Sequence, residues 1–275
     1  MTLRFALLGA GRIGKVHARA VASNPQAKLV AVADAFEKAA TELASAYGAE
    51  VHTVDAIEKA KDIDAVIICT PTDTHADLIE RFAKAGKAIF CEKPIDLDVK
   101  RVEQCLAVVE KANAVLMVGF NRRFDPHFAA VRKAIDDGAI GDVEMVTITS
   151  RDPGAPPLDY IARSGGIFRD MTIHDFDMAR FLLGEEPVAV SAHASVLVDK
   201  KIGEAAISIR SASFWKRLPA SRPSSPIRAA PPMATTSASR CTARKAWSRP
   251  RTSGRCRSSS PTTRAIPVRR CTTSS

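Results

Sequence analysis

Asp170 and His174 lie four residues apart in a stretch that predicts the start of a helix. This spacing places both side chains on one helix face, where a carboxylate can orient an imidazole and raise its basicity. Such a pair suits a general base near neutral pH. The same spacing also fits a helix cap followed by a surface histidine, and the pair alone leaves this alternative open.

Lys93 is a second residue suited to chemistry. It stands between Glu92 and Pro94, directly after the apolar residues 88–91, which predict a buried strand. The proline fixes the backbone after the lysine, and ligands bind at the carboxyl edge of parallel sheets. A lysine after a strand is often merely solvated, but this one is expected at a ligand-binding edge.

A glycine-rich turn begins the elements that must position these residues. Residues 9–14 are G-A-G-R-I-G, after an apolar run over residues 3–8 and before a helical pattern. Glycine is needed where the backbone takes positive φ and where a phosphate approaches backbone N–H groups. Asp34 follows 20 residues after Gly14, at the position of a ribose-binding carboxylate. The stretch predicts a dinucleotide site, with chance glycines in an ordinary turn as the alternative.

Strands and helices alternate through residue 120. Strands are predicted over residues 3–8, 29–33, 65–69, 88–91 and 115–118, with a weaker one near Val51, and helices over 12–22, 36–47, 74–85 and 98–112. Short links between alternating elements favour an α/β fold with a right-handed, doubly wound parallel sheet of six strands. Residues 1–120 are therefore expected to form one dinucleotide-binding domain.

Residues 121–205 predict the first part of a second, α+β domain. A helix over 126–136 and a strand over 144–149 precede a helix that ends near Leu183 and a strand over 188–198. The sequence after residue 205 shows neither the helical nor the strand spacing of apolar residues. This domain is therefore expected to be truncated, with an open antiparallel or mixed sheet.

The net charge of +10 divides unevenly along the 275 residues. Residues 206–275 hold 15 of the 40 Lys and Arg residues and none of the 30 Asp and Glu, so residues 1–205 carry a net charge of −5. The basic part is rich in Arg, Ser, Thr and Pro and is a poor core builder. We expect it to be an aberrant, poorly ordered tail.

The apolar runs are only as long as a strand, so none is expected to span a membrane. The sequence begins directly with a predicted strand and shows no signal segment, so a cytoplasmic location is expected. The six cysteines have no C-x-x-C pair, and the remaining histidines form no ligand cluster. We therefore expect neither a disulfide framework nor a metal site. Of those histidines, only His75 is expected near the cofactor.

Four segments together resemble the Gfo/Idh/MocA oxidoreductase family. They are residues 9–14, residues 70–75 (T-P-T-D-T-H), residues 92–94 (E-K-P) and residues 165–177, which contain G-G-x-x-x-D-x-x-x-H. Their spacing agrees with the family across residues 1–205, and they are most similar to those of enzymes that oxidise inositol. The resemblance implies a Rossmann domain and NAD-dependent oxidation of a secondary hydroxyl, most typically of myo-inositol to 2-keto-myo-inositol. Another sugar or polyol of the same family is the alternative.

The resemblance also implies roles for individual residues. His174 takes the hydroxyl proton, Asp170 orients it, and Lys93 holds the reacting oxygen. The residues expected to bind NAD are Gly9, Gly11, Arg12, Ile13, Gly14, Asp34, Thr70, Pro71, His75, Glu92 and Lys93. The residues expected to contact the substrate are Lys93, Arg123, Asp152, Asp170, His174 and Asp177. Family members form homotetramers through the second-domain sheet, an assembly that a truncated sheet puts in doubt.

The basic tail is compatible with a shifted reading frame. When the codons of Met233-Ala234 are read in the shifted frame, they must encode a glycine, and those of Trp247-Ser248 must encode a valine. Residues 226–252 decode without a stop into a sequence that contains I-E-V-H-G-S-K-G, which resembles the family's missing sheet. The free bases were chosen with the family in view, so the loss of one nucleotide near codon 205 is a hypothesis.

A functional Arg- and Ser-rich tail that binds nucleic acid is the competing hypothesis. The tail has no repeat, and Trp215 and Trp247 are too sparse for a base-stacking platform. We therefore expect no nucleic-acid partner. A catalytically silent NAD-binding protein is the other alternative.

Overall fold

The computed structural model describes residues 2–151, 154, 158–194, 201, 209–215 and 238–243. These residues fall into two compact units, one drawn from 1–122, 156–174 and 193–211, the other from 123–155, 175–192 and 212–275. Each unit is described by itself. The domain boundaries expected from the sequence, 1–120, 121–205 and 206–275, stay predictions.

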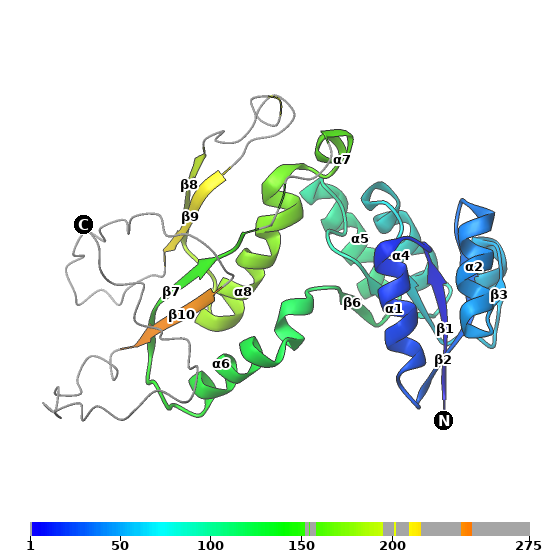
Figure 1. The fold of residues 1–275 in the computed structure, drawn as a ribbon, viewed down its shortest axis with the longest axis horizontal. Helices are drawn as coiled ribbons and strands as arrows, with labels where there is room; N and C mark the ends of the chain where they lie inside the picture. The colour runs from blue at the N-terminus through cyan, green and yellow to red at the C-terminus, as the bar shows by residue number, and fades with distance from the viewer. Residues whose placement is uncertain are drawn as a thin grey trace, which may run out of the picture. The chain divides into compact units, whose positions relative to one another are not determined.

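A six-stranded parallel sheet forms the centre of the first unit (Figure 1). Its strands are β1 (Leu3–Leu8), β2 (Ala27–Ala33), β3 (Glu50–Val51), β4 (Ala65–Ile68), β5 (Ala88–Cys91) and β6 (Leu116–Val118). They lie in the order β3-β2-β1-β4-β5-β6, so the order reverses between β1 and β4. This arrangement confirms the predicted doubly wound fold and places a ligand crevice at the carboxyl ends of these two strands.

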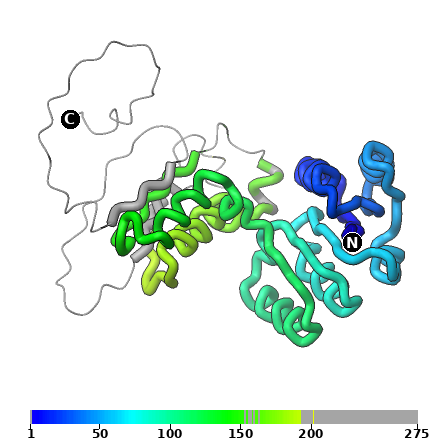
Figure 2. The backbone as a smooth tube through the Cα atoms, turned by 90° about the horizontal axis from the view of Figure 1, so that it is seen from below, coloured from blue at the N-terminus to red at the C-terminus, as the bar shows by residue number. Residues whose placement is uncertain are grey.

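Helices cover both faces of the sheet, as Figures 1 and 2 show for the part of the chain coloured blue to cyan. They are α1 (Arg12–Ala22), α2 (Glu37–Tyr47), α3 (Val54–Lys59), α4 (His75–Lys84) and α5 (Val99–Lys111), with a 3₁₀ turn η1 (Thr72–Thr74) before α4. Leu7 and Ile67 pack with α1 and α2, whereas their neighbours Leu8 and Ile68 pack with α3, α4 and α5. Strands buried on both faces explain the continuous apolar runs in the sequence.

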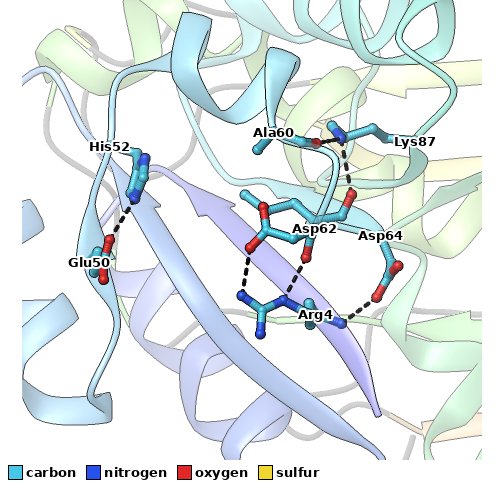
Figure 3. A network of polar contacts seen from close by, with 8 residues as sticks. Arg4, Glu50, His52, Ala60, Asp62, Asp64 and Lys87 are labelled. Carbon is cyan, nitrogen blue, oxygen red and sulfur yellow. Dashed lines mark hydrogen bonds and ion pairs between the residues drawn. The ribbon is translucent and has the colours of Figure 1, made fainter. Parts of the chain in front are cut away.

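A polar network ties together the amino ends of β1, β4 and β5 (Figure 3). The backbone N–H of Arg4 donates to Asp64 Oδ2 at 2.8 Å, and Arg4 Nε donates to the Asp62 carbonyl at 2.6 Å. Lys87 is buried, and its Nζ donates to the carbonyls of Ala60 at 2.6 Å and Ile63 at 3.0 Å. The cation thus satisfies carbonyls at the end of α3, on the opposite edge of the sheet from the glycine turn.

The elements after residue 120 are shorter. They are η2 (Asn121–Phe124), α6 (Pro126–Asp136), β7 (Val143–Thr149), α7 (Leu158–Arg163), the π-helical turn η3 (Phe168–Thr172), α8 (Ile173–Leu183), β8 (Ala189–Ala194), β9 (Ile209–Trp215) and β10 (Ala238–Ala243). Strand β7 pairs antiparallel with β10, and β8 pairs with β9. Two pairs of strands are consistent with the expected open sheet.

Three details differ from the sequence-based expectations. Helix α3 was not predicted, because its six residues are too few for a helical period to be visible. The sequence places Asp73 or Thr74 to cap α4; Thr74 does stand at the N-cap position, but no side-chain hydrogen bond caps the helix, and Thr74 Oγ1 donates instead to the Pro71 carbonyl at 2.8 Å. The strand expected over 188–198 is found at Ala189–Ala194, and residues 195–198 lie outside the described part.

The described part of the chain holds no helix that is both long and apolar enough to cross a membrane. Within that same part, His, Cys, Asp and Glu side chains form no group of three or more that could hold a metal ion.

Replacing Lys87 with Met is expected to destabilise the first unit by about 1–3 kcal/mol, because the carbonyls of Ala60 and Ile63 lose a buried charged donor. Urea denaturation measures the change. Lys84→Met is the control, since Lys84 is exposed and lies 3.6 Å from Glu80. Equal losses in the two variants would contradict a capping role for Lys87.

Candidate active site at the carboxyl edge of the first sheet

Close backbone approach explains two of the three glycines in the turn between β1 and α1. Gly9 has φ of 96°, and a Cβ there would lie 2.5 Å from the carbonyl oxygen of Cys69 at the end of β4. A Cβ on Gly14 would lie 1.9 Å from the carbonyl oxygen of Gly9. Side chains at these positions would push the turn away from the sheet.

Gly11 has a different environment. A Cβ at this position would meet nothing within 4 Å, and Gly11 caps α1 without a side-chain hydrogen bond. The first backbone N–H groups of α1 and its positive dipole end are therefore available to an anion. The helix begins with Arg12, which is exposed, and Ile13, which is half-buried. The open space at Gly11 fits the pyrophosphate of a dinucleotide.

Asp34 connects the glycine turn to the end of β2. Its Oδ2 accepts from the backbone N–H of Ala10 at 2.6 Å, and its Oδ1 accepts from that of Phe36 at 2.8 Å. These bonds place the carboxylate beside the turn, where a ribose-binding acid is expected. Its contact with a ribose stays a prediction.

The turn after β4 carries Thr70, Pro71 and His75. Thr70 Oγ1 lies 2.6 Å from Thr74 Oγ1, and the buried His75 ring lies between two carbonyls. His75 Nδ1 is 2.8 Å from the Pro94 oxygen, and Nε2 is 2.8 Å from the Thr70 oxygen. His75 thus links the turns that follow β4 and β5, and a direct contact of its ring with NAD stays a prediction.

Lys93 and Asp170 form the central ion pair of the candidate site. Lys93 Nζ lies 3.0 Å from Asp170 Oδ1 and donates to the Asp170 carbonyl at 2.8 Å. The side chains are only 16% and 19% exposed, so solvent screens the pair weakly. The structure therefore brings together two predicted catalytic residues that are 77 positions apart in the sequence.

A pair of glycines directs the chain into the helical segment that carries Asp170. Gly165 and Gly166 have φ of 79° and 75°, values that residues other than glycine rarely adopt. A Cβ on Gly165 would also lie 2.7 Å from Leu97 Cδ2. Asp170 then falls in the π-helical turn η3, and such turns are frequent at functional sites.

His174 lies in the first turn of α8, directly after η3. Its ring meets that of Phe120 edge to face, with centroids 6.5 Å apart and planes at 84°. Asp170 and His174 thus occupy one continuous helical segment, as predicted. The orientation of His174 by Asp170 stays a prediction.

Tyr160 is a site residue that the sequence pattern did not indicate. Its hydroxyl donates to Asp170 Oδ1 at 3.0 Å, the same oxygen that Lys93 contacts. Burial and the charge of Asp170 raise the pKa of Tyr160 to about 12, so it remains a donor at neutral pH. No motif links positions 160 and 170, and only the fold of the segment reveals this contact.

Glu92 meets His17 of α1, a residue that was not expected near the site. Glu92 Oε1 lies 2.7 Å from His17 Nε2. Burial pushes the pKa of Glu92 upward, but the hydrogen bond and charge of His17, with the backbone N–H and charge of Lys93, outweigh it. The pKa therefore lies below its ordinary value, and the carboxylate is ionised.

Arg123 and Asp177, both in the second unit, bind each other. Arg123 Nε and Nη2 donate to the two Asp177 oxygens at 2.8 and 2.6 Å, and Asp177 is only 5% exposed. This bidentate bond raises the pKa of Arg123. The substrate contacts expected of these two residues stay predictions, and Asp152 lies outside the described residues.

Two thiols lie at the carboxyl ends of β4 and β5, those of the half-buried Cys69 and the buried Cys91. Burial raises the pKa of Cys69 to about 12 and raises that of Cys91 further. Both therefore remain neutral thiols, which supports a packing role and not a nucleophilic one.

The glycine turn, the anion-accepting end of α1 and the carboxylate at the end of β2 define a dinucleotide-binding protein of the Rossmann class. Comparisons with known proteins identify the family. Residues 3–120 match the oxidoreductase family with an NAD-binding Rossmann fold, and residues 128–214 match the Gfo/Idh/MocA C-terminal domain. The chain belongs to the Gfo/Idh/MocA oxidoreductase family, and its first domain is an NAD-binding Rossmann domain.

Relatives agree with this assignment over the first three quarters of the chain. The inositol 2-dehydrogenase of Rhizobium meliloti (strain 1021) is 78% identical over 205 residues, which are 74% of this chain and 62% of that enzyme. A crystal structure of a myo-inositol dehydrogenase from Corynebacterium glutamicum has a TM-score of 0.72 at 48% identity, over 74% of this chain and 62% of that one.

A second solved structure contains bound ligands. The scyllo-inositol dehydrogenase of Lactobacillus casei, with NAD(H) and scyllo-inositol, has a TM-score of 0.69 at 33% identity, over 74% of this chain and 63% of that one. The chain spans 62% and 61% of the length of the inositol dehydrogenases of Rhizobium meliloti and Thermotoga maritima that it matches.

Two glycine variants should separate cofactor binding from folding. Gly11→Ala is expected to weaken NAD binding about tenfold without loss of stability, because its methyl group occupies the open space where the pyrophosphate would approach. Gly14→Ala is expected to cost about 1–3 kcal/mol of stability, because its methyl group collides with the Gly9 carbonyl. Calorimetric NAD titration and urea denaturation measure the two effects, and the reverse pattern would refute the assignment.

Glu92 is expected to make stability depend on pH. Since its folded-state pKa lies below the ordinary value of 4.5, the carboxylate stabilises the fold above that pH, and this contribution is lost as pH falls through the folded-state pKa. The stability advantage of the wild type over Glu92→Gln should therefore be steady from about pH 7 to 5 and shrink as the pH falls below about 4.5. Glu103→Gln, at an exposed position of α5, is the control. An advantage that stays constant would contradict the lowered pKa.

Proposed function

We propose that the protein oxidises a secondary hydroxyl of a cyclic polyol, and that myo-inositol is converted to 2-keto-myo-inositol. The observation that carries this proposal is the Lys93–Asp170 ion pair at the ligand-binding edge of an NAD-binding domain. The inositol 2-dehydrogenase name of the 78% identical relative supports the choice of substrate. Another sugar or polyol is the nearest alternative within the family.

NAD, when bound, supplies the acceptor for the hydride that leaves the carbinol carbon. The chain's own residues then have to remove one proton and hold one oxygen. His174 accepts the hydroxyl proton, and Asp170, on the same helical segment, supports the imidazolium that forms. Lys93, already held by Asp170, donates to the reacting oxygen and stabilises its developing negative charge.

Arg123, Asp152 and Asp177 are proposed to contact the remaining ring hydroxyls. The buried Asp177 carboxylate is held by the Arg123 fork, and this fixed pair presents donors in a defined plane. We also propose a cytoplasmic location, and a homotetramer for a chain with a complete second-domain sheet.

The change in composition after residue 205 supports a shifted reading frame in this gene. The identity to relatives also spans about 205 residues, and the 30 acidic residues all precede residue 206. On this proposal, the printed chain retains its cofactor-binding part and lacks part of the substrate pocket. If the frame is intact, the alternatives are a basic tail that binds nucleic acid and a catalytically silent NAD-binding protein.

His174→Ala is expected to lower kcat/KM by about a hundredfold or more in a frame-restored protein assayed for NADH formation with a panel of inositols and sugars. His127→Ala, at an exposed position, should change it less than about twofold. Unchanged turnover in His174→Ala would refute its assignment as the base. Failure to form NADH with any of the polyols would refute the proposed activity.

The printed chain is expected to bind NAD but to show weak or no turnover, whereas the frame-restored protein should be active. Sequencing the DNA from about codon 195 onward tests the premise directly. An intact frame, together with salt-dependent retention of the chain on DNA, would favour the nucleic-acid alternative.

A further inference from the structure

The His17–Glu92 contact connects two segments that serve different parts of the site. His17 lies in α1, whose amino end follows the glycine turn, and Glu92 directly follows β5. Their side chains are 21% and 20% exposed, and Nε2 and Oε1 are 2.7 Å apart. The His17 ring also packs on Phe90, with centroids 4.9 Å apart. The imidazole is therefore held on one side by an aromatic ring and on the other by a carboxylate.

The Glu92 carboxylate is confined as well. A Cβ on Gly119, which follows β6, would lie 3.1 Å from Glu92 Oε2. The backbone N–H of Glu92 donates to the Ile68 carbonyl at 2.9 Å, which continues the β4–β5 pairing. His17 of α1, the backbone of β4 and the glycine after β6 thus surround the residue.

Lys93 inherits this fixed geometry because it is the next residue. Lys93 directly follows Glu92 in the chain, and its Nζ reaches Asp170 Oδ1 at 3.0 Å. A displacement of Glu92 would therefore move the start of the Lys93 side chain. A displacement of α1 would be transmitted to Glu92 through His17.

We propose that His17 and Glu92 form a positioning pair that couples the phosphate-binding helix α1 to the side chain of Lys93. Binding of the pyrophosphate at the amino end of α1 and alignment of Lys93 then stabilise each other. Coupling of this kind is reciprocal, so weakening the pair lowers NAD affinity and also loosens Lys93. The consequence for turnover rests on the proposed function, whereas the coupling itself does not.

Two measurements on the full chain test the coupling without relying on turnover. Calorimetry gives the dissociation constant of NAD. Carbon-13 NMR of reductively methylated protein reports the environment of Lys93, whose signal is assigned by its absence in Lys93→Arg. Both are recorded for His17→Phe, which keeps a ring against Phe90 but removes the donor to Glu92.

The expected result for His17→Phe is roughly fivefold or weaker NAD binding and a displaced Lys93 signal. His52→Phe is the matched control, because His52 Nε2 lies 3.1 Å from Glu50 Oε2 at the start of β3, the edge strand on the far side of the sheet from β5 and β6. It should change neither quantity. His17→Gln, which retains a donor, should restore both toward the wild type.

A folded His17→Phe protein with wild-type NAD affinity and an unmoved Lys93 signal would overturn the proposal. If His17→Phe does not fold, Glu92→Leu combined with His17→Leu replaces the pair by apolar side chains. Wild-type values in that double variant would also overturn the coupling. Absence of polyol oxidation in the frame-restored protein would instead refute the proposed function and leave the coupling test unaffected.

Discussion

The close approach of the glycine turn to the sheet is the constraint on which the site depends. Gly14 packs its Cα against the Gly9 carbonyl, and Gly9 packs against the end of β4. These contacts set the entry of α1, and α1 in turn carries both the open backbone at Gly11 and the imidazole of His17. No side chain fits at Gly9 or Gly14, so the turn can pack closely against the sheet. The same close packing leaves the backbone N–H groups at the start of α1 open to a phosphate.

A second constraint is the mutual dependence of the half-buried charges. Lys93 or Asp170 alone would be poorly solvated at this edge, and removing one partner leaves the other uncompensated. Tyr160 shares the Asp170 oxygen with Lys93, so the carboxylate is held from two sides before any substrate arrives. Pre-set donors of this kind do not need to reorganise when charge develops on a reacting oxygen.

The sequence predicted what depends on local pattern. Strands buried on both faces, the glycine turn and the Lys93, Asp170 and His174 motifs were recognisable because each leaves a periodic or spaced signal. The contacts of His17 with Glu92 and of Tyr160 with Asp170 were missed, since they join residues 75 and 10 positions apart through tertiary packing. Sequence spacing along one segment carries no information about such pairs until the sheet order is known.

Strand pairing in the second unit extends beyond the part of the chain that matches the family. Strand β10 pairs with β7 over Ala238–Ala243, beyond the last residue of the family match at position 214. Ladder hydrogen bonds come from the backbone, so almost any sequence can supply them. Register and face are specified by alternating apolar residues, which the segment A-S-R-C-T-A largely lacks. Met145 of β7 stays exposed in this pairing.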